Sequence, residues 1–188
     1  MKKIIHICLI FSSIILFSQT KLKLKDFEFS TYDINHGKTL IYTYSTLDKN
    51  GKLLVYLDDH LTRPIYFEYN LKESEIKYIN DLLEKKTLHS FIKTKKLEEN
   101  TFYTEERNYI SFKRKNKIDK MCFINPLMYD DFQKIANILH SYIYDLKKEN
   151  LIEQFQINIP QIKEKITLQN KIDNFLPEKS LPPPPMRQ

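Results

Sequence analysis

Apolar and polar residues alternate along four short segments near the beginning of the chain, and such alternation is typical of half-buried β-strands. The segments are 27–34 (FEFSTYDI), 39–47 (TLIYTYSTL), 53–57 (LLVYL) and 65–69 (IYFEY). The pair Asn50-Gly51 separates the second segment from the third, and an Asn-Gly pair between two alternating runs is a strong hairpin signal. Because the connections are short, the sequence predicts a four-stranded antiparallel meander.

After the fourth strand the apolar positions change to a helical spacing, at Ile76, Ile79, Leu82 and Leu83. With Lys72 at the N-cap position, Glu75 becomes the third helical residue, where a carboxylate favours the free backbone amides. Leu71 and Ile76 are then placed as a hydrophobic staple. A helix is therefore predicted to begin just after Lys72.

A second hairpin and helix follow. The segment 108–125 (NYISFKRKNKIDKMCFIN) predicts a hairpin that turns at RKNK, and 129–148 predicts a helix that can continue through NLIEQF. An offset of 56 residues carries Ile79, Leu82 and Leu83 onto Ile135, Ile138 and Leu139. On the strand side the offset is 55, with Pro126 as the extra residue, and it aligns Cys122 with Phe67. We interpret the pattern as two copies of a β-β-α unit, and chance similarity between two amphipathic helices is the alternative.

The expected fold class is α+β, an antiparallel β-sheet of six or seven strands with two amphipathic helices on one face, spanning residues 21–150. The helices are expected to pack on Ile65, Phe67, Ile110, Phe112 and Cys122. Residues 151–176 form a C-terminal extension in which Pro160 ends the preceding run and 161–176 has helical spacing. The proline-rich tail, 177–188, is predicted to be disordered.

Residues 1–20 have the three parts of an export signal, which are a basic start, an apolar run at 4–17 and a short polar end. The apolar run is shorter than the roughly 20 residues of a membrane span. Small residues at the expected positions are absent for cleavage after Ser18 or Gln19, so an uncleaved anchor is the alternative. The sequence predicts a periplasmic or secreted protein, or an inner-membrane anchored one that meets the membrane only through residues 1–20.

The amino-acid composition limits the kinds of site that the chain can contain. Hydrophobic residues make up 41% and charged residues 29% of the chain, as in ordinary globular proteins. Gly37 and Gly51 are the 2 glycines, too few for a phosphate-binding loop, so no nucleotide cofactor is expected. Beyond residue 20 only Cys122 remains of the cysteines, which excludes an internal disulfide.

Some residues resemble reactive groups but are better explained structurally. Cys122 and His140 could pair as a nucleophile and its base, yet the alignment with Phe67 favours a buried cysteine. Asp58, Asp59 and His60 could bind a metal, but their place in a hairpin turn favours turn chemistry, and no metal site is predicted. Glu105 and Glu106 show no partner carboxylate, and the basic tip at 113–117 is expected to be a solvated turn rather than a nucleic-acid site.

The binding prediction concerns tyrosines. Leu40, Tyr42 and Tyr44 are expected on one side of their strand, and Tyr56 and Tyr66 lie in the next two strands. If Tyr42, Tyr44, Tyr56 and Tyr66 share the sheet face opposite the helices, they form an exposed aromatic surface that could bind a partner. The alternative is a second core layer covered by residues 87–100 or by the C-terminal segment.

These observations together predict an exported envelope or periplasmic protein that acts as a non-enzymatic binding module. Its expected partner is another envelope protein or a glycan, and neither a cofactor nor a nucleic acid is expected. One alternative is a hydrolase whose site is assembled from distant residues such as Cys122 or the Asp58–His60 turn. The other alternative is a membrane-anchored envelope scaffold that keeps residues 1–20.

Overall fold

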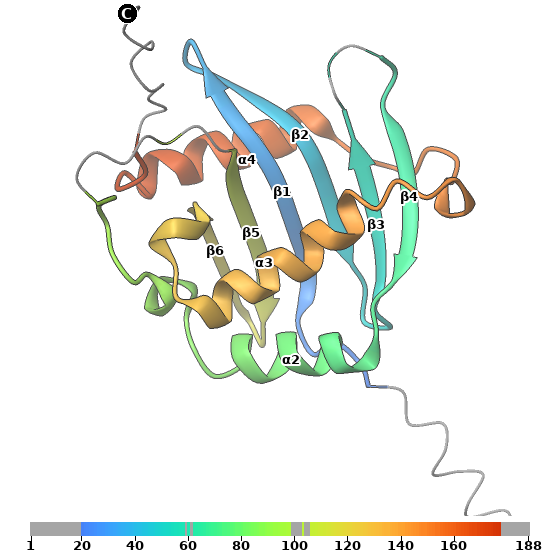
Figure 1. Cartoon of the computed structure of the whole chain (residues 1–188), viewed down its shortest axis with the longest axis horizontal. Helices are drawn as coiled ribbons and strands as arrows, with labels where there is room; N and C mark the ends of the chain where they lie inside the picture. The colour runs from blue at the N-terminus through green and yellow to red at the C-terminus, as the bar shows by residue number, and fades with distance from the viewer. Residues whose placement is uncertain (1–19, 59, 61, 99–102, 104–105, 178–188) are drawn as a thin grey trace, which may run out of the picture.

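The computed structural model describes residues 20–58, 60, 62–98, 103 and 106–177. Their core is one antiparallel sheet of six strands in the order β4-β3-β2-β1-β5-β6 (Figure 1). The α+β class and the antiparallel sheet are therefore confirmed. The strands are β1 Lys25–Asn35, β2 Lys38–Leu47, β3 Lys52–Leu57, β4 Ile65–Asn70, β5 Arg107–Arg114 and β6 Lys117–Phe123.

The first four strands form the predicted meander, and β5 then pairs with the free side of β1. The predicted turns are correct, because Gly51 separates β2 from β3 and Lys115-Asn116 joins β5 to β6. Strands β4 and β6 become the two edges of the sheet. The edge of β4 is partly covered, since the backbone N–H of Ile152 donates to the carbonyl of Tyr66 over 3.0 Å.

Helix α2, Glu73–Leu83, begins as the sequence predicts. The backbone N–H of Lys72 donates to Oε2 of Glu75 over 2.8 Å, so the acidic residue satisfies an amide ahead of the first turn. Of the predicted apolar stripe, Ile76, Ile79 and Leu83 are buried and Leu82 is partly buried.

Helix α3, Asp130–Ile143, is shorter than the predicted 129–148. Its buried residues pack with those of α2 and with strand residues such as Phe29, Phe67 and Phe123 in one core cluster. Phe67, Ile110 and Phe112 belong to this cluster as expected. Two expectations are wrong. Ile65 is 38% exposed. Cys122 belongs to a different cluster, because its neighbours Met121 and Phe123 point to the face of α2 and α3 and successive residues of a strand point to opposite faces.

Helix α4, Ile159–Ile172, lies across the sheet in Figure 1 and starts earlier than expected. Oδ1 of Asn158 accepts from the backbone N–H of Gln161 over 3.1 Å, which caps the helix. Pro160 fits the first turn because its missing N–H would have no helical partner there. Within the described ranges no helix combines the length and apolarity that crossing a membrane requires. Residues 1–19 and 178–188, on which the predictions for the signal and the tail depend, lie outside those ranges.

Candidate functional site: a groove on the tyrosine face of the sheet

The tyrosines occupy one row across the sheet. Cα partners in successive strands are Tyr66, Tyr56, Tyr44, Ser30, Tyr109 and Cys122, in that order. We call this side of the sheet the tyrosine face. Ile162 and Ile166 of α4 belong to the same core cluster as Tyr44, Tyr56, Tyr109 and Cys122. The arrangement is a second core layer covered by the C-terminal segment.

An exposed surface of four tyrosines is therefore not present. Tyr44 and Tyr56 are 6% and 4% exposed, and burial raises the pKa of both phenols, so they stay protonated. Tyr66 is partly buried, with its ring 5.7 Å from that of Tyr56 and 5.5 Å from that of Phe155. Tyr42 is partly buried and its ring lies 5.3 Å from that of His60.

Tyr42 differs from Tyr44 because the pairing of β1 and β2 is irregular between them. Thr31 is opposite Thr43, but Tyr32 is opposite Ile41, which leaves Tyr42 as an extra residue. As a result, Ile41 joins Tyr44 in the core cluster. The expected alternation of Leu40, Tyr42 and Tyr44 on one side is wrong at this bulge.

The next row of the tyrosine face lies beside α4 and is more open, although Ser111 is buried and Lys165 of α4 reaches Glu28. Its Cα partners are Glu68, Leu54, Thr46, Glu28, Ser111 and Lys120. All but Glu68 line two open pockets of about 670 and 290 Å³. The pockets share Glu28, Thr46 and Lys165, so together they form one groove beside α4.

The lining of the groove combines apolar surface with charged groups whose signs balance. The larger pocket has three acidic residues, Asp26, Glu28 and Asp48, and three lysines, Lys113, Lys120 and Lys165. Nζ of Lys165 bridges the groove to Oε1 of Glu28 at 2.9 Å. The smaller pocket adds the amide side chains of Gln156, Asn158 and Gln161 and the ring of Phe155. The groove thus offers donors and acceptors together with apolar surface, which is the larger part of the lining in the larger pocket.

The wall formed by α4 is fastened by a buried carboxylate. Asp173, 2% exposed, accepts from the backbone N–H of Cys122 over 2.8 Å and from Nε2 of Gln169 over 2.7 Å. Its other oxygen lies 3.2 Å from Nε2 of His89. Sequence reasoning missed Asp173, because its partners come from β6 and from the segment Leu88–Phe91, far away along the chain.

A second fastening uses Asn170 of α4. Its Oδ1 accepts from the hydroxyl of Tyr32 over 2.7 Å and from Nη1 of Arg107 over 2.9 Å. Nη2 of Arg107 donates to the carbonyl of Pro177 over 2.8 Å. These bonds keep the helix close to the sheet, so one wall of the groove is rigidly placed.

Cys122 and His140, the candidate nucleophile and base, lie on opposite faces of the sheet. Cys122 is 0% exposed on the tyrosine face, and burial raises the pKa of its thiol, which keeps it protonated. The imidazole of His140 packs 5.2 Å from the ring of Phe29, which belongs to the cluster of α2 and α3, and it is 3.0 Å from Oδ1 of Asn108. The sheet thus separates the two groups.

The side chain of Asp58 in the turn at Asp58–His60 is occupied by contacts with nearby residues. Oδ2 of Asp58 accepts from the hydroxyl of Tyr56 over 2.8 Å and lies 3.3 Å from Nδ1 of His60. Asp59 and Glu105 are outside the described residues. Among the residues that are described, no group of three His, Cys, Asp or Glu side chains could hold a metal ion. Glu106 accepts from the hydroxyl of Tyr144 over 3.3 Å.

Comparisons with known proteins give no relative: no family model matches the chain, and no curated protein or solved structure matches it significantly.

Proposed function

We propose that the chain is an exported, non-enzymatic binding protein of the envelope or periplasm, and that it holds an extended polar ligand in the groove of the tyrosine face. The ligand class that fits best is a glycan. The observation that carries the proposal is the row from Leu54 to Lys120, which lines the two open pockets and runs across five strands beside a fixed helix.

The dimensions and charge of the groove support this ligand class. Five strands at the usual spacing give a row of roughly 20 Å, enough for several sugar units. Because its carboxylates and lysines balance, the groove has no strong field that would select a highly charged ligand. Hydroxyl, amide and ammonium groups such as Thr46, Gln161 and Lys120 are donors and acceptors that sugar hydroxyls need.

Another envelope protein fits the groove less well. Protein interfaces depend on a few large aromatic or apolar anchors that are surrounded by near-neutral contacts. In the described lining, Ile118 is 63% exposed, whereas Phe27 and Phe112 are each 1% exposed and serve the core. The hydrolase alternative gains no support, since Cys122 is buried and the carboxylate of Asp58 is in contact with the imidazole of His60.

The fold itself is consistent with a duplication. We infer that β3-β4-α2 and β5-β6-α3 are two copies of one unit, with their helices on the same face of the sheet. Phe67 and Phe123 both belong to the cluster of α2 and α3, and they are 56 residues apart. An offset of 56 therefore suits the second strand and the helix of each unit, whereas the first strand keeps its face with an offset of 55, which carries Val55 onto Ile110.

A binding experiment with a blocked groove tests the proposal. Residues 20–188, in wild-type form and with Thr46→Arg, would be incubated with oligosaccharides released from envelope glycans of the native cells. Thr46 lies where the two pockets join, so an arginine there fills the groove. Thr87→Arg is the control, because Thr87 is exposed and outside the groove.

The expected result is that the wild type and Thr87→Arg retain the same oligosaccharide and Thr46→Arg does not, while all three melt at similar temperatures. The proposal fails if no oligosaccharide is retained, or if the groove variant retains it as well as the wild type does.

A further inference from the structure

Exposed lysines gather at one end of the domain, where α2, the turn between β2 and β3 and the turn between β5 and β6 lie together (Figure 1). We call this the basic end. Its exposed lysines are Lys21, Lys23, Lys25, Lys49, Lys85, Lys86, Lys115 and Lys117. The exposed carboxylates of the same segments are fewer, namely Asp26, Asp48, Glu73, Asp81 and Glu84, of which Glu84 pairs with Lys23. The exposed residues of the basic end therefore carry a net positive charge.

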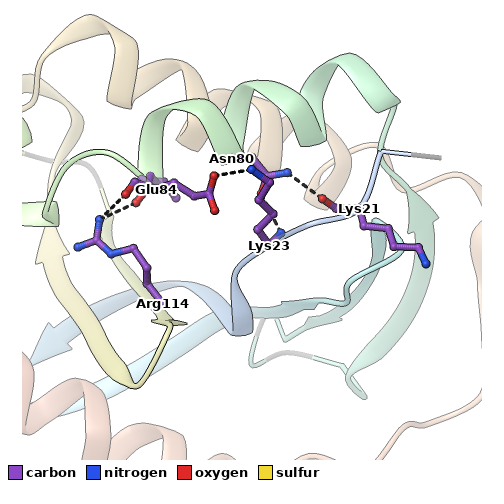
Figure 2. A network of polar contacts seen from close by, with 6 residues as sticks. Lys21, Lys23, Asn80, Glu84 and Arg114 are labelled. Atoms are coloured by element: carbon purple, nitrogen blue, oxygen red, sulfur yellow. Dashed lines mark hydrogen bonds and ion pairs between the residues drawn. The ribbon is translucent and has the colours of Figure 1, made fainter. Parts of the chain in front are cut away.

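Arg114 joins two parts of the basic end (Figure 2). Its Nη1 donates to the carbonyls of Leu83, Glu84 and Lys86 over 3.0, 3.0 and 2.9 Å. The arginine thus caps the C-terminus of α2, where the helix dipole favours a cation. This contact places Lys115 and Lys117 next to Lys85 and Lys86.

The chain enters the domain at the same end. Nδ2 of Asn80 donates to the carbonyl of Lys21 over 2.8 Å, and Oδ1 of Asn80 accepts from the N–H of Lys23 over 2.9 Å (Figure 2). The N–H of Leu22 donates to the carbonyl of Lys49 over 2.9 Å, and the Leu22 side chain is buried. The entry segment is therefore fixed to α2, so the chain before residue 20 is attached to the domain at the basic end.

We propose that the basic end of the domain binds the anionic headgroups of a phospholipid membrane. Lysines near an anionic bilayer are each attracted to its surface potential, and the attraction needs no shaped pocket. The apolar run at 4–17 comes shortly before Lys21 in the sequence, so a retained N-terminus inserted in a membrane would hold the lysines at its surface. That run also favours a membrane over a nucleic acid as the partner.

Vesicle flotation tests this proposal on residues 20–188, which include all residues of the core clusters. The vesicles would consist of phosphatidylcholine alone or of phosphatidylcholine mixed with phosphatidylglycerol. We expect binding to the mixed vesicles only, and weaker binding as salt is raised. A triple variant, Lys85→Gln, Lys115→Gln and Lys117→Gln, is expected to lose roughly fivefold in affinity for each lysine removed.

The control removes the same charge elsewhere, with Lys38→Gln, Lys148→Gln and Lys171→Gln, all exposed and outside the basic end. It should bind the mixed vesicles nearly as well as the wild type does. Absence of binding to the mixed vesicles, or equal losses in the two triple variants, would overturn the proposal. Retention on a DNA duplex without vesicle binding would also overturn it, in favour of a nucleic acid. None of these lysines lines the groove, so the result is independent of glycan binding.

Discussion

The backbone N–H of Cys122 donates a 2.8 Å hydrogen bond to the buried carboxylate of Asp173. Cys122 lies in the edge strand β6, and Asp173 directly follows α4. The bond therefore ties the edge of the sheet to the helix that covers the tyrosine row and forms one wall of the groove.

Replacing Asp173 with Ala should destabilise the protein substantially. Ala leaves the buried backbone N–H of Cys122 and the side-chain amide of Gln169 without the carboxylate oxygen that accepts from both of them. We expect a loss of about 2 kcal/mol in the free energy of unfolding, measured by urea denaturation. Asp145→Ala is the control, since Asp145 pairs with Lys147 at the surface and its loss should change stability little. Equal effects of the two variants would contradict the assigned role of Asp173.

His140 should make the protein less stable in mild acid. Burial against Phe29 and Tyr144 lowers the pKa of His140 to about 4 from an ordinary 6.5, so the unfolded chain takes up the proton first. The contribution of neutral His140 to the free energy of unfolding is fully present above pH 6.5 and is lost as the pH falls toward 4. The expected loss between pH 7 and pH 5 is about 2 kcal/mol.

His140→Gln should remove most of this pH dependence, because Gln can still bond to Asn108 and does not titrate. His36→Gln, at an exposed turn, should leave it unchanged. Urea denaturation at several pH values compares the three proteins. The assignment to His140 is wrong if its variant loses as much stability in acid as the wild type.

Cys122 should be chemically inert in the folded protein. Its thiol is buried and its raised pKa keeps it protonated, so it lacks the thiolate that reacts with disulfide reagents. In residues 20–188 we expect no labelling of the native state and full labelling in urea. Cys122→Ala should lower stability by about 1 kcal/mol because it leaves a small cavity. Rapid labelling of the native state would instead support the enzymatic alternative.

Arg114 should matter more for stability than the lysines beside it. Arg114→Gln loses hydrogen bonds to three carbonyls at the end of α2, and we expect a cost of about 1–2 kcal/mol, as for a lost helix cap. Lys115→Gln at the exposed turn should stay within about 0.5 kcal/mol of the wild type. Thermal melting compares the two variants, and similar melting temperatures would contradict the capping role.

The features that could be predicted from the sequence depend on neighbouring residues. The start of α2 follows from Lys72 and Glu75, and the turn at Gly51 follows from an Asn-Gly pair, because their contacts are local. The burial of Cys122 was also correct. Its face was wrong, since the assumed extra residue at Pro126 shifted the strand by one, and a one-residue shift reverses every side chain of a strand.

The features that were missed depend on contacts between distant segments. Nothing near Tyr42 marks the bulge, and nothing near Arg114 shows that its guanidinium caps α2 rather than facing solvent. The covering of the tyrosine row by α4 depends on Asp173 and Asn170, whose partners lie on β6, β1 and β5. The groove exists because α4 covers the row of Tyr44 and Tyr109 and lies beside the next row.

The central claim is that the groove of the tyrosine face binds the ligand, and NMR mapping tests it most directly. Amide resonances of ¹⁵N-labelled residues 20–188 would be followed while the oligosaccharide retained by the protein is added. The account predicts shifts concentrated at Glu28, Thr46, Ser111 and Lys120, with little change in α2 and α3. Shifts concentrated on α2 and α3, or no specific shifts at all, would contradict it.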